Sequence, residues 1–154
     1  MARLTAAHRA VFDSPGIEDG MAIQHVSGYL NAMKVIHDAD AQAVLVIRHQ
    51  AIPMVFNDAM WAKYGVGKLA QLADGSRNPY GQRITALGAR VIVLGCDQAT
   101  RNFTGRMASG AGGDRTAVYE EVKANLLPGV ILQPTGVYAV HRAQEGGCTM
   151  IRST

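Results

Sequence analysis

The sequence contains little of what several classes of protein require. Its 154 residues include only two cysteines, Cys96 and Cys148, which form neither a CxxC redox pair nor a zinc pattern nor a disulfide framework. No apolar stretch is long enough to span a membrane, and the first residues lack the apolar run of a signal peptide. We therefore expect a cytoplasmic protein with reduced thiols and no membrane partner, although export of a longer precursor is compatible with the same sequence.

Charge is also too scarce and too scattered to indicate a nucleic-acid partner. Charged residues make up 18% of the chain and the net charge is +3, with no run of consecutive Lys and Arg. Aromatic residues are 6% of the chain and do not alternate with basic ones. The five histidines have no ligand spacing, so the sequence predicts neither a metal site nor a cofactor.

The chain does have the apolar content of a globular protein, since 48% of its residues are hydrophobic. At this length we expect a single domain over residues 1–154. Short apolar segments that read as strands alternate with segments of helical periodicity; the expected strands are His8–Asp13, Ala43–Ile47, Arg90–Cys96, Val130–Leu132 and Cys148–Ile151. The alternation predicts an α/β fold, a mainly parallel five-stranded sheet with helices on both faces and flavodoxin-like layering.

The expected helices follow from apolar spacing, caps and breakers, and they span Gly20–His37, Ile52–Gly65, Tyr80–Leu87, the segment from Cys96 to Met107, Asp114–Leu127 and the segment from Thr135 to Gly146. Residues Val66–Pro79 read as an irregular excursion over the surface. Together with the apolar segment Met54–Tyr64, this excursion predicts more apolar surface than one chain covers, and hence a homo-oligomer.

Cys96 is the leading candidate for chemistry, because it follows a buried strand and precedes a helix. Ligands bind at the carboxyl ends of strands in open α/β sheets, and a helix N-terminus favours a thiolate. Parallel strands bring Asp13, Arg48 and His49 to the same edge, where positive charge stabilises a thiolate or a bound anion. The competing interpretation is that Cys96 is a small buried apolar residue.

Two further residues complete the expected rim of this site. Asn57 lies soon after the second strand, and Trp61 offers an aromatic wall. The alternative role of these rim candidates is that of a structural cap or a surface residue. Cys96 ends a strand whereas Cys148 begins one, so in a parallel sheet they lie at opposite edges, too far apart for a disulfide.

The chain resembles the DsrE/DsrF-like family of small α/β proteins. The resemblance covers nearly the whole chain: the opening strand and long helix, the strand that ends in Cys96, and the closing stretch from Leu127-Pro128-Gly129-Val130 to Gln144-Glu145-Gly146. It implies a homotrimer or homohexamer and, in one branch, sulfur relay with Cys96 as carrier and Arg101 as its helix arginine. This chain departs from that branch at Asp97, whose charge opposes a thiolate if it lies close by.

Two functions remain open at this stage. The first is a sulfur carrier, possessing sulfurtransferase-like activity, in which Cys96 holds a persulfide and exchanges it with a protein sulfur donor or acceptor. The alternative is a non-catalytic homo-oligomer that binds a small anion, an aromatic ligand or haem at the same edge.

Overall fold

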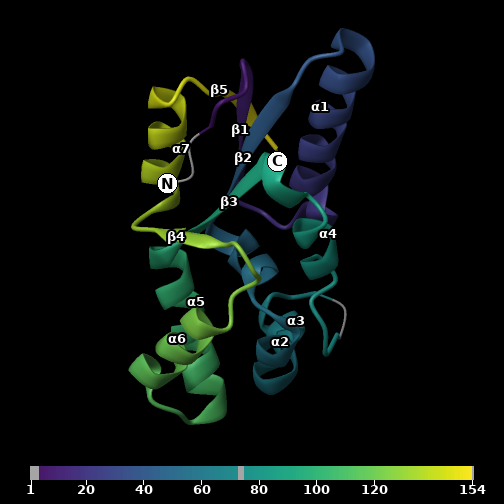
Figure 1. Ribbon diagram of the computed structural model, residues 1–154. Helices are drawn as coiled ribbons and strands as arrows, with labels where there is room; N and C mark the ends of the chain where they lie inside the picture. Colours follow the sequence, from purple (N-terminus) through teal and green to yellow (C-terminus); the bar gives the residue numbers. More distant parts are fainter. Residues whose placement is uncertain (1–3, 73–74, 154) are drawn as a thin grey trace.

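The strands form one sheet in which every pairing is parallel. The computed structural model describes residues 4–72 and 75–153. The strands are β1 (His8–Ser14), β2 (Ala41–Ile47), β3 (Val91–Cys96), β4 (Ile131–Gln133) and β5 (Thr149–Arg152). Their order across the sheet is β4-β3-β2-β1-β5, and Figure 1 shows them between two helices. The predicted α/β fold, with its five strands, is confirmed.

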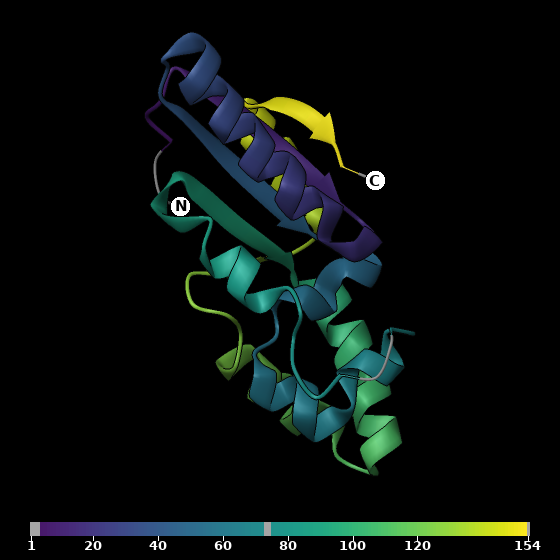
Figure 2. The same ribbon diagram turned by 90° about the vertical axis from the view of Figure 1, so that its right-hand side faces the viewer.

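The strand order explains why helices cover both faces. From β1 to β4 the chain moves in one direction across the sheet, whereas the connection from β4 to β5 returns to the far side of β1. Since crossovers between parallel strands are right-handed, a return in the opposite direction lies on the opposite face. Accordingly α1 (Met21–His37) covers one face and α7 (Gly136–Glu145) covers the other (Figures 1 and 2).

Alternate residues of the strands supply the two apolar layers. Phe12 and Leu45 pack in the cluster that contains the buried face of α1, while Val11 and Val46 pack against α7. Both sides of the central strands are therefore buried, which is why these strands read in the sequence as continuous apolar runs instead of alternating ones.

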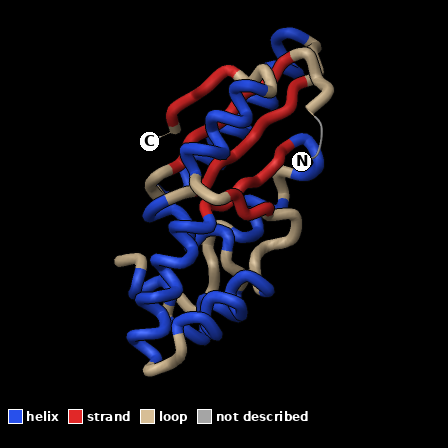
Figure 3. The backbone as a smooth tube through the Cα atoms, turned by 90° about the vertical axis from the view of Figure 1, so that its left-hand side faces the viewer, coloured by secondary structure: helices blue, strands red, loops and turns tan. Residues whose placement is uncertain are grey.

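The remaining helices gather beyond the carboxyl ends of the strands (Figures 1 and 3). After β2 come the 3-10 helix η2 (His49–Val55), α2 (Asp58–Tyr64), α3 (Val66–Leu69) and α4 (Gly81–Thr85). After β3 come α5 (Asp97–Ala111) and α6 (Arg115–Ala124). Short 3-10 turns, η1 (Glu18–Gly20) and η3 (Gly88–Arg90), precede α1 and β3. Helices η2, α2, α3, α4, α5 and α6 form the lower layer, which lies over the sheet edge at which the candidate residues were expected, whereas η3 lies at the amino end of β3.

The predicted helix Ile52–Gly65 is wrong, because the chain breaks at Phe56. Phe56 has an extended backbone, and the side chain of Asn57 caps a new helix by accepting from the amide of Met60 at 3.1 Å. A distant side chain fixes the break: the amide of Asn78 donates to the carbonyl oxygens of Met54 and Phe56 at 2.8 and 2.7 Å. The end of α2 at Gly65 is confirmed.

The apolar surface expected over Met54–Tyr64 is also absent. Met54, Phe56, Met60 and Trp61 are buried within this same chain, in the cluster beneath the sheet. They fill space left by the short helices of the lower layer. The predicted oligomer thus loses this support, and of the excursion Val66–Pro79, residues 73–74 lie outside the described part of the chain.

Two other features bear on the sequence interpretation. Cys148 precedes β5 at the amino edge, both cysteines are free, and the parallel placement of β5 confirms that they lie at opposite edges. Over residues 4–72 and 75–153, no helix combines the length and the apolar character needed to cross a bilayer.

Candidate functional site

The carboxyl ends of β1 and β2 bring Asp13 and Arg48 together, as the parallel sheet predicted. Nε and Nη2 of Arg48 donate to the two carboxylate oxygens of Asp13 at 2.6 and 2.7 Å. The Arg48 side chain is 18% exposed and that of Asp13 is 8% exposed. Hydrogen bonding to Asp13 raises the pKa of Arg48 against the opposing effect of burial, and the charges of Asp13 and Cys96 raise it further. The result is a bidentate, largely buried ion pair with Cys96 within its electrostatic reach.

Cys96 occupies the junction that its sequence position indicated. It ends β3 and is the N-cap of α5, where its Sγ accepts a hydrogen bond from the backbone amide of Ala99 at 3.4 Å. Only 6% of the residue is exposed. An amide donor and the positive end of a 15-residue helix both favour a negative charge on this sulfur.

The edge at Cys96 is also the point where the chain changes sides of the sheet. Cys96 pairs with Gln133 of β4, but the chain leaves β3 through α5, which packs in the cluster with α1, and leaves β4 through α7 on the opposite face. In open α/β sheets, ligands bind at the crevice between two such strands. The N-termini of two helices, α5 and α7, therefore flank Cys96.

Arg48 lies against the start of α7 through a contact that only glycine permits. A Cβ atom at Gly136 would stand 2.5 Å from Cδ and 2.6 Å from Cβ of Arg48. The absence of a side chain at Gly136 therefore lets the arginine lie between β2 and α7. Glycine is a poor helix former, and the sequence alone gives no reason for one in the first turn of this helix. The close approach of Arg48 supplies that reason.

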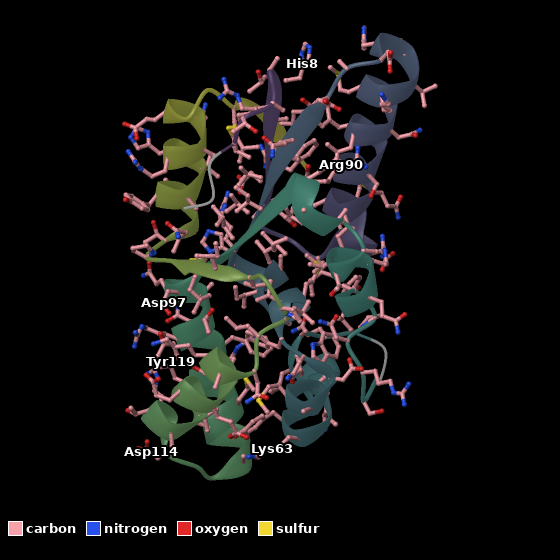
Figure 4. The ribbon with its side chains drawn as sticks, viewed as in Figure 1. His8, Lys63, Arg90, Asp97, Asp114 and Tyr119 are labelled. Atoms are coloured by element: carbon pink, nitrogen blue, oxygen red, sulfur yellow. The ribbon has the colours of Figure 1, made fainter. Side chains whose placement is uncertain are left out.

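Arg101 contacts a different group from the one expected. Its Nε donates to Asp97 at 2.8 Å and its Nη2 to the hydroxyl of Tyr119 at 2.9 Å, while its guanidinium lies 4.0 Å from the centre of the Tyr119 ring. Tyr119 donates to the other oxygen of Asp97 at 2.5 Å. Figure 4 shows Asp97 and Tyr119 on adjacent helices of the lower layer. This cluster connects α5 to α6. It also neutralises the charge of Asp97, which would otherwise oppose a thiolate at Cys96.

The cluster gives Tyr119 a testable signature. Burial, followed by the hydrogen bond to Asp97 and its charge, raises the pKa of Tyr119 to about 12 from 10.0. The folded state therefore holds this proton more tightly than the unfolded state, so the contact stabilises the fold below pH 10 and loses that contribution as the pH rises toward 12. We expect the stability advantage over Tyr119→Phe to shrink in that window. Ultraviolet titration should then assign to Tyr119 a phenol that ionises well above 10; ionisation near 10 would contradict the expectation.

His49 follows Arg48 in the chain, but its side chain lies on the face of the sheet that α1 covers, whereas Arg48 lies toward α7. His49 has a left-handed backbone, with φ of 48°, directly after the extended residue Arg48. The turn sends its side chain to a cavity of about 750 Å³ instead of toward Asp13; this cavity is lined by Pro15, Gly16, Glu18, His49, Gln50, Ala99, Asn102, Phe103, Arg106 and Arg152. Ala99 lines this cavity, and its backbone amide donates to the Cys96 sulfur, so this residue lies between the cavity and Cys96.

Asn57 and Trp61 have structural roles. Asn57 caps α2, and its amide donates to Asn125 at 3.1 Å, which ties α2 to the end of α6. Trp61 is 1% exposed and its Nε1 donates to the carbonyl oxygen of Pro53 at 3.0 Å. The expectation that Trp61 forms an aromatic wall of the site is wrong, because the indole is enclosed in the core. Within the described ranges, no three side chains of His, Cys, Asp or Glu gather closely enough to hold a metal ion.

Comparison with known proteins informs the fold alone. No protein-family model matches the sequence, and no curated protein sequence matches it either. A solved structure, the protein of unknown function MTH1491 from Methanobacterium thermoautotrophicum, superposes with a TM-score of 0.59 at 19% identity, covering 94% of this chain and 98% of that one. At this identity the likeness establishes a shared α/β fold over nearly the full length of both chains.

Proposed function

We propose that this protein is a DsrE-like sulfur carrier in which Cys96 holds a persulfide. The observation that carries the proposal is the position of the Cys96 sulfur: it caps α5 at the point where the chain changes sides of the sheet. Donors that stabilise a thiolate also stabilise the terminal sulfur of a persulfide, since each carries one negative charge. Arg48, which Asp13 holds in place, interacts electrostatically with a negatively charged Cys96.

The reaction needs only a sulfane donor. The Cys96 thiolate attacks the outer sulfur of thiosulfate, the sulfur–sulfur bond of the donor breaks, and sulfite leaves with its electron pair, so that the charge of −3 is the same before and after. A partner's thiolate then attacks the outer sulfur of the persulfide and releases Cys96 as a thiolate. Because the residue is 6% exposed, we expect a small anion to reach it more readily than a bulky reagent.

Intact-mass analysis after incubation with thiosulfate tests the carrier function. We expect one adduct of about 32 Da on the wild-type protein, removed by dithiothreitol, and none on Cys96→Ser. The matched control is Cys148→Ser, which should retain the adduct, because burial raises the pKa of Cys148 against a partial offset from Arg9. An adduct located on Cys148, or no adduct until the protein is unfolded, would refute the carrier function.

The second candidate is a non-catalytic binding protein, and the cavity beside His49 favours it. This function needs no reactive thiol, so Cys96→Ser would bind as the wild type does.

For either function we propose a homotrimer or homohexamer in the cytoplasm, where thiols stay reduced. Light scattering should report a particle several times larger than the 16.4 kDa chain.

A further inference from the structure

Two adjoining cavities form an elongated groove along the carboxyl edge, on the side of the sheet that faces α1. One cavity of about 750 Å³ lies beside His49, and another of about 490 Å³ extends toward the end of α3. Both cavities are lined by the same four residues, Glu18, Gln50, Phe103 and Arg106. We call the space formed by these two neighbouring cavities the edge groove. Its two parts have the size of sites that hold small organic molecules.

Four charged side chains line the edge groove, those of Glu18, Asp19, Arg106 and Arg152, and of these Glu18 and Arg106 line both cavities. Glu18 curves back over Gly16, where an added Cβ would lie 3.2 Å from its Oε1. The guanidinium of Arg106 lies 4.4 Å from the centre of the Phe103 ring, and its Nη1 makes a long hydrogen bond of 3.4 Å to the carbonyl oxygen of Leu69. Among the described residues, neither Glu18 nor Arg106 has an ion-pair partner.

The backbone around the edge groove is unusual as well. Five described residues other than glycine have a positive φ, and four of them line the groove: Glu18 at 41°, Asp19 at 51°, His49 at 48° and Gln71 at 59°. They come from three separate segments of the chain. Left-handed conformations of such residues are strained, and they cluster where a structure fixes side chains around a ligand.

We propose that the edge groove binds a zwitterionic amino acid with an apolar side chain. Arg106 presents a forked donor to the carboxylate, and Glu18 presents an acceptor to the ammonium group. A ligand with only one charge satisfies one of these groups and repels the other. Met21, Leu69 and Leu72 line the α3 end of the groove and provide apolar contacts for the side chain. Because both charged residues are exposed, the expected affinity is modest, with a Kd of about 0.1–1 mM.

The inference rests on the second candidate function, binding at this edge, and it does not depend on the chemistry of Cys96. The test is an amide-resolved NMR titration of the full chain with L-methionine and with L-leucine. We expect at least one probe to give saturable shifts at Glu18, Gln50 and Arg106. N-acetylmethionine, which lacks the ammonium, and methionine amide, which lacks the carboxylate, should bind at least about tenfold more weakly than methionine or not at all.

Variants separate the possible outcomes. Arg106→Gln and Glu18→Gln should each weaken binding of the responding probe at least about tenfold, whereas Arg142→Gln, on helix α7 at the opposite face of the sheet, should bind as the wild type does. Equal binding of the zwitterion and its singly charged analogues would overturn the inference but leave a binding function. No saturable shift with any probe would overturn both. Neither result bears on the persulfide adduct at Cys96.

Discussion

Replacing Arg48 by methionine is expected to lower the free energy of unfolding by about 3–5 kcal/mol. Methionine keeps most of the apolar contact with α7, but it removes the bidentate partner of a carboxylate that is 8% exposed. The uncompensated charge of Asp13 then stays buried, and this desolvation, not the lost attraction, dominates the effect. Urea denaturation of the two proteins measures the difference.

Two variants show whether the buried charge is responsible. The double variant Asp13→Asn, Arg48→Met should regain part of the loss, since an amide is less costly to bury than a lone carboxylate. Arg142→Met is the matched control, because Arg142 pairs with Glu145 at the surface, where the side chains are 51% and 48% exposed; it should change stability by less than about 1 kcal/mol. Equal losses for Arg48→Met and Arg142→Met would contradict our account of the pair.

Replacing Asn78 by aspartate is expected to cost about 3–4 kcal/mol, although the two side chains have nearly the same shape. Asn78 is 7% exposed, and its side-chain amide donates to the carbonyl oxygens of Met54 and Phe56, while its side-chain oxygen accepts from the backbone amide of Tyr80 at 2.9 Å. A carboxylate removes both donors and places a negative oxygen against two carbonyl oxygens.

The same chemical change at an exposed position provides the control for Asn78. Asn102 lies on the surface of α5, so Asn102→Asp should change the free energy of unfolding by less than about 0.5 kcal/mol. If Asn78→Asp and Asn102→Asp lower the free energy of unfolding equally, then the hydrogen bonds from Asn78 to Met54 and Phe56 do not stabilise the break between η2 and α2.

The fold could be predicted from the sequence because its signals are local. Buried parallel strands read as continuous apolar runs, and the helix starts at Asp114 and Thr135 are confirmed by side chains that accept from the amides of Ala117 and Tyr138. The meeting of Asp13 with Arg48 also followed from the sheet, because the carboxyl ends of adjacent parallel strands share an edge.

The groove and the packing of Trp61 could not be predicted in this way. Glu18 and Arg106 line the same groove although 88 positions separate them and no motif connects them, and the left-handed backbone at His49 has no sequence signal. Trp61 has the helical spacing of a surface or a core residue, and only the break at Phe56, set by the distant Asn78, decides that it faces inward. Tertiary contacts overrode helix periodicity at that point.

The position of β1 also has a consequence for how the chain is made. β1 lies inside the sheet, between β2 and β5, and Ala10 of β1 pairs with Thr149 of β5. During synthesis, the backbone donors and acceptors on one edge of β1 thus stay unpaired until residues 149–152 have been made. An unpaired edge can pair with strands of other chains, so we expect the nascent protein to be most prone to aggregate after α7 has formed and before β5 has joined the sheet. Chaperones that shield extended segments would matter most for this protein in that interval.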